Sequence, residues 1–140
     1  MSSKKQFGTY IKHISDVLQK NCNSALASKG LTMSQLTVLH VLYNTADNEM
    51  TLKELEKHLQ VAQSTVVGII NRLQQKGFIE SYSSAEDKRV KIVSMTDDGK
   101  KSFLESQSYA FESESYILSC LSETEQNILN SLLEKISKNL

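Results

Sequence analysis

Apolar residues recur along this chain of 140 residues at the three- and four-residue spacing that is typical of amphipathic helices. The spacing predicts helices over about residues 5–29, 33–44, 51–59, 63–76, 99–121 and 123–140. Two β-rich runs, residues 78–83 and 89–95, lie on either side of a polar turn at residues 84–88. The pattern therefore predicts a mainly α fold with about six helices and a two-stranded β ribbon.

Capping residues mark several of the expected helix ends. Three hydroxyl residues are each followed three positions later by Glu or Gln, which is the capping-box pattern: Thr32 with Gln35, Thr51 with Glu54, and Ser122 with Glu125. Glycines occur where left-handed C-terminal caps are expected, at Gly30 and Gly77. Thr96 and the two acids after it open the helix that continues from Gly99, and residues 46–49 are expected to form a loop.

The order of the central elements is informative. A short helix turns through Gln60 and Val61 into a second helix, and the ribbon follows. Helix, tight turn, helix and ribbon is the plan of a winged helix-turn-helix, which reads double-stranded DNA. We expect one domain over residues 1–140, with a DNA-binding unit at about 33–98 and further helices at about 4–30 and 99–140.

The second helix of this unit has an unusual outer face. At 100° per residue, Val66, Ile69, Ile70 and Leu73 share the core side. The candidate DNA-contacting positions of this helix are Gln63, Ser64, Thr65, Val67, Gly68, Asn71 and Arg72. Small, polar, nearly uncharged side chains suit close approach to base edges in a major groove. Asn71 can pair with adenine and Val67 can meet a thymine methyl group, so we expect A·T-rich half-sites.

Gly68 admits three readings. It costs the helix about 1 kcal/mol relative to Ala, which favours a backbone that must come near a partner. Alternatively, the glycine is merely tolerated, or it packs against the preceding helix.

The run Asp87-Lys88-Arg89, followed by residues 90–95 and by Thr96-x-x-Gly99, resembles the wing signature of the MarR family of bacterial transcriptional regulators. Upstream, STVVGIINRLQQKGFIE is similar to the recognition helix of that family. The resemblance implies a homodimer that binds a near-palindromic operator, often as a repressor, and is often released by a small ligand or by thiol oxidation. It also implies a ligand pocket between the dimerisation helices and the winged unit.

The resemblance assigns roles to individual residues. Arg89, at the start of the second wing strand, would enter the minor groove with Asp87 holding its guanidinium group. Arg72 would contact phosphate, and Ser64 and Thr65 would contact phosphate or bases. Lys88 and Lys91 are either phosphate contacts or solvated lysines. Three positions depart from the pattern: Gly68 stands where many members have Arg, Val67 where many have Thr or Ser, and Ala62 where the N-cap is usually Ser or Asp.

The terminal helices have apolar stripes that little else in the chain is left to cover. We interpret them as a homodimer interface, with Ile11, Ile14, Ile117, Leu121, Ile128, Leu132, Leu133 and Ile136 as the candidate contact residues. In the alternative, the protein is a monomer whose terminal helices fold onto the winged unit.

The formal net charge is zero, but the basic and acidic residues are unevenly distributed along the chain. Residues 53–101 carry nine basic and seven acidic residues, whereas residues 102–140 carry two lysines and six glutamates. This asymmetry fits a protein that holds DNA at one end only. No apolar run approaches the length of a membrane span, and the N-terminus lacks the apolar segment of a secretory signal, so we expect a cytoplasmic location.

The sequence shows no catalytic arrangement, and we expect neither an enzyme, nor a cofactor, nor a bound metal. His13, His40 and His58 are isolated, with no second His at i+4 and no obvious carboxylate partner. Cys22 is either a redox switch or a buried structural cysteine, and Cys120 is expected in the core. The alternative function is a winged-helix protein-interaction module without specific DNA binding, which the zero net charge and Gly68 would fit.

Overall fold

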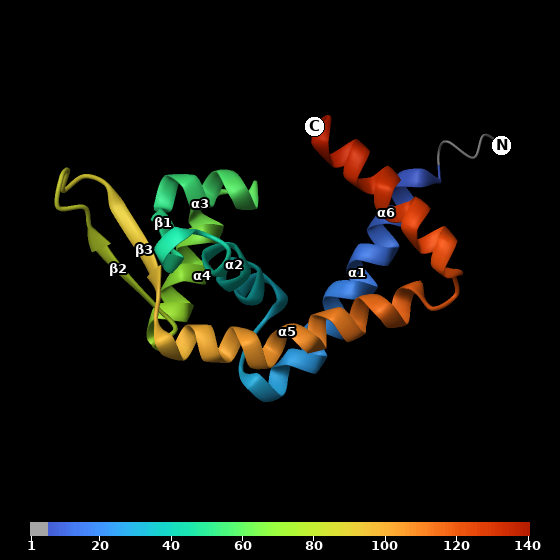
Figure 1. Ribbon diagram of the computed structural model, residues 1–140, viewed down its shortest axis with the longest axis horizontal. Coiled ribbons are helices and arrows are strands. Elements are labelled where there is room, and N and C mark those ends of the chain that lie inside the picture. The colour runs from blue at the N-terminus through green and yellow to red at the C-terminus, as the bar shows by residue number, and fades with distance from the viewer. Residues whose placement is uncertain (1–5) are drawn as a thin grey trace.

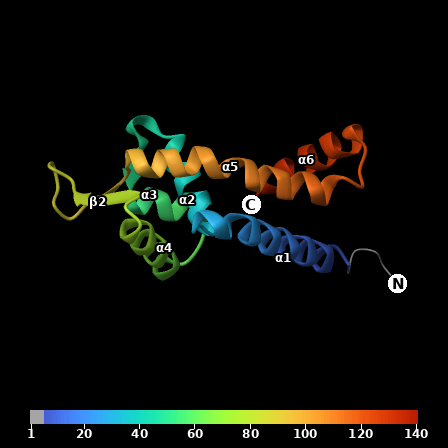
Figure 2. The same cartoon turned by 90° about the horizontal axis from the view of Figure 1, so that it is seen from below.

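The computed structural model describes residues 6–140, so Lys4 and Lys5, which open the first predicted helical segment, lie outside the described residues. The chain forms an elongated molecule with the winged unit at one end and parts of the terminal helices at the other (Figures 1 and 2). The α-helices are α1 (Phe7–Leu26), α2 (Met33–Tyr43), α3 (Leu52–Leu59), α4 (Gln63–Gln75), α5 (Asp97–Leu118) and α6 (Glu123–Lys138). The strands are β1 (Glu49–Thr51), β2 (Ile79–Ser83) and β3 (Lys91–Met95), and short 3-10 helices cover Ala27–Lys29 and Ala46–Asn48.

The expected fold class is confirmed, with one addition to the sheet. The sheet has three antiparallel strands in the order β1-β3-β2, because β1 pairs with β3 through Met50 opposite Val93. Residues 46–49 were expected to be a loop, but Ala46–Asn48 is a 3-10 helix and Glu49 begins β1. The prediction missed β1 because a three-residue strand has no periodicity of its own and exists only through its pairing with β3.

Hydrogen bonds at the helix ends agree with most of the predicted caps. The capping boxes of Thr32 and Ser122 are complete, and Thr96 accepts a bond from the backbone N–H of Gly99 at 3.0 Å. Gly30 and Gly77 have left-handed φ angles of 68° and 76°. The box predicted at Thr51 is only half formed: Thr51 Oγ1 accepts from the N–H of Glu54, but the N–H of Thr51 donates no bond to the Glu54 carboxylate.

The core is built mainly from aliphatic side chains. Leu26, Leu39, Leu42, Leu55 and Leu73 are fully buried, together with valines from α2, α4 and β3. A further tight contact joins α5 to the residue before β2. A Cβ atom added at Gly99 would lie 2.0 Å from the carbonyl oxygen of Phe78, so this close approach requires glycine.

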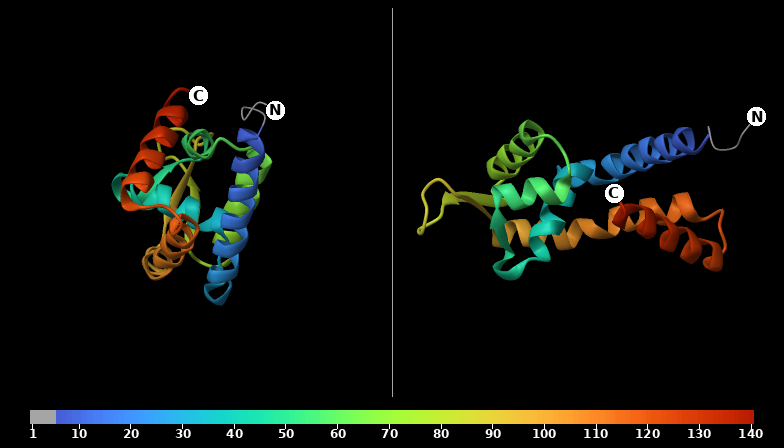
Figure 3. Two further views of the ribbon diagram at one scale, coloured as in Figure 1. Left: turned by 90° about the vertical axis from the view of Figure 1, so that its right-hand side faces the viewer. Right: turned by 90° about the horizontal axis from the view of Figure 1, so that it is seen from above.

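The long helix α5 connects the two ends of the molecule. Near its start, Phe103 stacks on His40 and contacts Tyr43 of α2. Farther along, α5 runs beside α1, and α6 folds back from its end (Figures 1 and 3). The prediction that Cys120 belongs to the core is wrong: it is exposed, since α5 ends at Leu118 and the thiol lies in the turn before α6. No helix between residues 6 and 140 is both long enough and apolar enough to cross a membrane.

Candidate nucleic-acid interface

Helix α4 is anchored by one face and presents the other to solvent. A left-handed residue, Gln60 with φ of 53°, makes the tight turn from α3. Val66, Ile70 and Leu73 are buried, and Ile69 is half-buried, so the predicted core side is confirmed. Ala62 is the N-cap and supplies no side-chain bond, which leaves the first N–H groups of the helix without a side-chain partner from the cap.

The structure exposes the predicted contact face of α4. Gln63, Ser64, Thr65, Val67, Gly68, Asn71 and Arg72 are all exposed. An added Cβ atom at Gly68 would meet nothing within 4 Å, so the reading in which this glycine packs against the preceding helix is wrong. No acidic residue occurs in α4, and its exposed surface is therefore one that a polyanion can approach.

The wing projects from the body beside α4 (Figure 1). At its tip, the guanidinium group of Arg89 donates from Nε and Nη2 to the two carboxylate oxygens of Asp87, each at 3.2 Å. The backbone N–H of Arg89 also donates to Asp87 Oδ1 at 3.0 Å. These bonds to Arg89, from its side chain first and its backbone second, lower the pKa of Asp87 below its ordinary value. The forked pair expected between these two residues is confirmed.

Arg89 lies in the turn and not in the strand. The prediction that it begins the second wing strand is wrong, because β3 starts at Lys91. The N–H of Ser84 still donates to the carbonyl oxygen of Val90 in the register of the two strands, but the N–H of Val90 donates back to Asp87 within the turn, and the ladder ends there. The side chain of Arg89 is 91% exposed, and Lys88 and Lys91 are exposed as well. The wing tip thus carries three cations close together in the chain.

Two features of the wing were missed by sequence reasoning. The hydroxyl of Tyr82 on β2 donates to the carboxylate of Glu49 on β1, and this bond raises the pKa of Tyr82. It joins the two outer strands across β3 and helps to fix the wing on the body. In addition, a hollow of about 560 Å³ separates α3 and the start of α4 from the wing, lined in part by Lys53, Gln63 and Arg89. A basic residue at Lys53 gave no signal, because an exposed helix lysine is ordinarily just solvated.

The two cysteines differ sharply. Burial raises the pKa of the Cys22 thiol, and the negative charge of Glu114 raises it further. Cys22 is 1% exposed within the core, so its surroundings are those of a structural cysteine. Among residues 6–140, no three His, Cys, Asp or Glu side chains gather as a metal site would require.

The helix-turn-helix, the acid-free exposed helix and the arginine-tipped wing define a winged helix-turn-helix protein. The MarR family profile matches residues 31–91. HTH-type transcriptional regulator BilQ of Clostridium symbiosum is 30% identical over 117 residues, which are 84% of this chain and 80% of BilQ. The chain therefore belongs to the MarR family.

The protein chains of two solved DNA complexes are similar to this chain over nearly its whole length. A cysteine-to-serine variant of MarR from Escherichia coli, bound to operator DNA, is 25% identical with a TM-score of 0.83, over 92% of this chain and 91% of that one. The complex of Staphylococcus aureus MepR with DNA is 26% identical with a TM-score of 0.84, over 100% and 99%.

Proposed function

We propose that this protein is a transcriptional repressor that binds double-stranded DNA in a sequence-specific manner. The observation that carries the proposal is the exposed, acid-free face of α4, which lies beside a wing tipped by Arg89. A helix of 10–12 Å with its side chains fits the major groove, and the adjacent wing then lies over the minor groove. The DNA complexes of MarR and MepR support this docking, since both have the same fold. The protein acts where the chromosome is, in the cytoplasm, by binding and not by catalysis.

The DNA-contacting residues follow from this docking. Val67, Gly68 and Asn71 face the base edges, and Ser64 and Thr65 at the start of α4 face phosphate or bases. Arg89, oriented by Asp87, enters the minor groove, where A·T tracts narrow the groove and deepen its negative potential. Arg72, Lys88 and Gln63 contact the phosphates of the DNA backbone.

The operator is near-palindromic because the functional unit is a homodimer. No residue of α6 is buried, and its apolar residues Ile128, Leu132, Leu133 and Ile136 are 42–54% exposed. Ile11 and Ile14 of α1 are 42% and 46% exposed, and with Ile117 they line an apolar hollow of about 260 Å³ against α6. Leu121 is half-buried between α5 and α6. A second copy would cover these side chains. Their exposure speaks against the monomeric alternative, in which the terminal helices would fold onto the winged unit and be covered by it.

A small effector molecule would bind between α2 and α5. A hollow of about 290 Å³ there is lined by Phe103, Phe111 and His40 together with Met33 and Leu36. Thr37, Gln107 and Glu114 also line the hollow, so its mixed aromatic and polar walls suit a small aromatic molecule that carries hydrogen-bonding groups. Binding at this junction between the winged unit and the terminal helices would change the spacing of two recognition helices and so release the operator.

Fluorescence anisotropy with the DNA upstream of the protein's own gene tests the proposal. We expect binding that survives an excess of scrambled duplex at about 150 mM salt, where non-specific contacts are weak. Sites selected from random sequence should show A·T pairs opposite Val67 and Asn71. An invariant guanine contacted by α4 would refute that specificity. Equal affinity for every sequence would favour the interaction module without specific DNA binding.

A further inference from the structure

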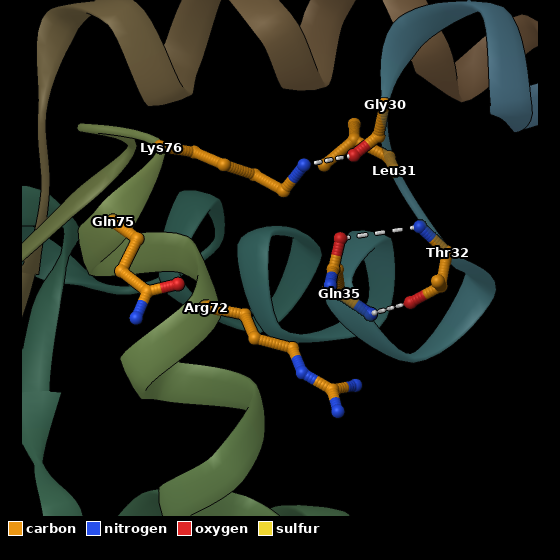
Figure 4. A pocket seen from close by; sticks show the side chains of 7 residues that line it. All are labelled: Gly30, Leu31, Thr32, Gln35, Arg72, Gln75 and Lys76. Atoms are coloured by element: carbon orange, nitrogen blue, oxygen red, sulfur yellow. Dashed lines mark hydrogen bonds between the residues drawn. The ribbon is translucent and has the colours of Figure 1, made fainter.

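A second hollow lies along the other flank of α4, between that helix and the junction of α1 with α2. Its volume is about 440 Å³. It is lined by Gly30, Leu31, Thr32, Gln35, Arg72, Gln75 and Lys76 (Figure 4). Helix α4 thus has one hollow on the wing side and one on the α2 side.

The lining of this second hollow, which we call the junction hollow, is rich in hydrogen-bond donors and positive charge. Arg72 is exposed and extends from α4 toward the start of α2 (Figure 4), and it forms no ion pair with residues 6–140. The ammonium group of Lys76 donates to the carbonyl oxygen of Gly30, which holds the charge at the rim. None of the lining residues is acidic. The chemistry suits an anion with several acceptor oxygens.

Gln35 supplies an independent sign of a ligand. It is only 4% exposed, and its Oε1 accepts from the backbone N–H of Thr32 at 3.2 Å. The return bond, from the N–H of Gln35 to Thr32 Oγ1, is also 3.2 Å. Because only the amide oxygen can accept from an N–H, this capping box fixes the orientation of the side chain. Its Nε2 group has no hydrogen-bond partner in the described chain and remains free to donate in the hollow.

We propose that the junction hollow binds a backbone phosphate of the operator, on the strand that borders the major groove on the side away from the wing. This inference rests on the proposed DNA binding. A helix that fills a groove about 12 Å wide has one sugar-phosphate backbone along each flank. The wing side meets one strand, and the junction hollow meets the other. Arg72, Lys76 and the Gln35 amide then share one phosphate, which sets the register of α4 without reading sequence.

Gln35→Glu is the informative substitution. A glutamate keeps the capping box, as Glu125 does in this chain by accepting from the N–H of Ser122 at 2.9 Å. It replaces the two free N–H donors with negative charge facing the phosphate. The matched control is Ser34→Glu, which adds the same charge at a neighbouring exposed position in the first turn of α2 that does not line the hollow.

We expect Gln35→Glu to weaken operator binding at least about tenfold more than Ser34→Glu, with thermal unfolding midpoints close to wild type in both. Equal losses in the two variants would overturn the proposal, because the effect would then be one of added charge alone.

Operator duplexes with a single neutral methylphosphonate locate the contact. At one position per half-site, on the strand away from the wing, the neutral linkage should lower the operator affinity of the wild type. The affinity of Arg72→Met should not change at that position. If no single neutral linkage on that strand lowers the wild-type affinity, that result would overturn the assignment. So would displacement of wild type from the operator by millimolar sulfate that Arg72→Met resists, since the hollow would then be a site for free anions. Failure of the wild type to bind the unmodified operator would instead refute the proposed function.

Discussion

Replacement of Arg89 by Ala is the most direct test of the wing. In the free protein this side chain is 91% exposed, and among residues 6–140 its guanidinium group bonds only to Asp87. Its removal therefore leaves the core, the sheet and the exposed face of α4 unchanged. We expect a wild-type unfolding midpoint and wild-type oligomeric state for Arg89→Ala.

The expected loss of operator affinity in Arg89→Ala follows from the N–H donors of Arg89 that Asp87 leaves free. A guanidinium group has five N–H donors, and the fork to Asp87 uses Nε and one N–H of Nη2. The rest can reach acceptors in the minor groove. An arginine contact of this kind is worth about 1–3 kcal/mol, which is about fivefold to more than a hundredfold in affinity for each protomer. The slope of log affinity against log salt should fall by about one for each arginine removed.

Anisotropy titrations of the operator at about 50 to 200 mM salt measure both quantities. Arg89→Lys keeps the charge but cannot form the fork, so its affinity should lie between those of wild type and Arg89→Ala. Lys138→Ala controls for lost charge, because Lys138 lies near the end of α6 and pairs with Glu134. The preference for A·T pairs in the flanks of the operator should be weaker in Arg89→Ala than in the wild type. Unchanged operator affinity in Arg89→Ala at moderate salt would refute the role.

Further predictions concern the interface, the thiol and the glycines. Charged residues at Leu132 and Leu133 should give monomer or aggregate, and a variant that stays dimeric by light scattering would exclude this interface. Because burial raises the pKa of Cys22, its thiol is protonated at neutral pH, so peroxide should affect wild type and Cys22→Ser equally; loss of operator binding in wild type alone would establish a redox switch. Gly99→Ala should destabilise the fold by about 3 kcal/mol or more in thermal unfolding, since the new Cβ meets backbone. Gly68→Ala is the control: it should stabilise α4 by about 1 kcal/mol, and unchanged operator affinity would show that the glycine is merely tolerated.

The sequence by itself determined the features that depend on neighbours a few residues away. The helix starts at Thr32, Thr96 and Ser122 are set by side chains that bond three residues ahead, so their residue types suffice to predict them. The helix-turn-helix and the division of α4 into buried and exposed faces follow from periodicity in the same way. The fork between Asp87 and Arg89 also joins near neighbours, two residues apart, and the resemblance to the wing signature was enough to predict it.

Only the tertiary structure decided what depends on distant segments. Strand β1 exists because Met50 meets Val93, and Gly99 is required because Phe78 crosses it. The junction hollow is held by the bond from Lys76 to Gly30, which are 46 positions apart. A capping pattern predicts that Gln35 accepts a hydrogen bond, but not that its nitrogen is left free beside Arg72. Local bonds are encoded in local residue types, whereas the position of a free donor depends on how whole helices pack.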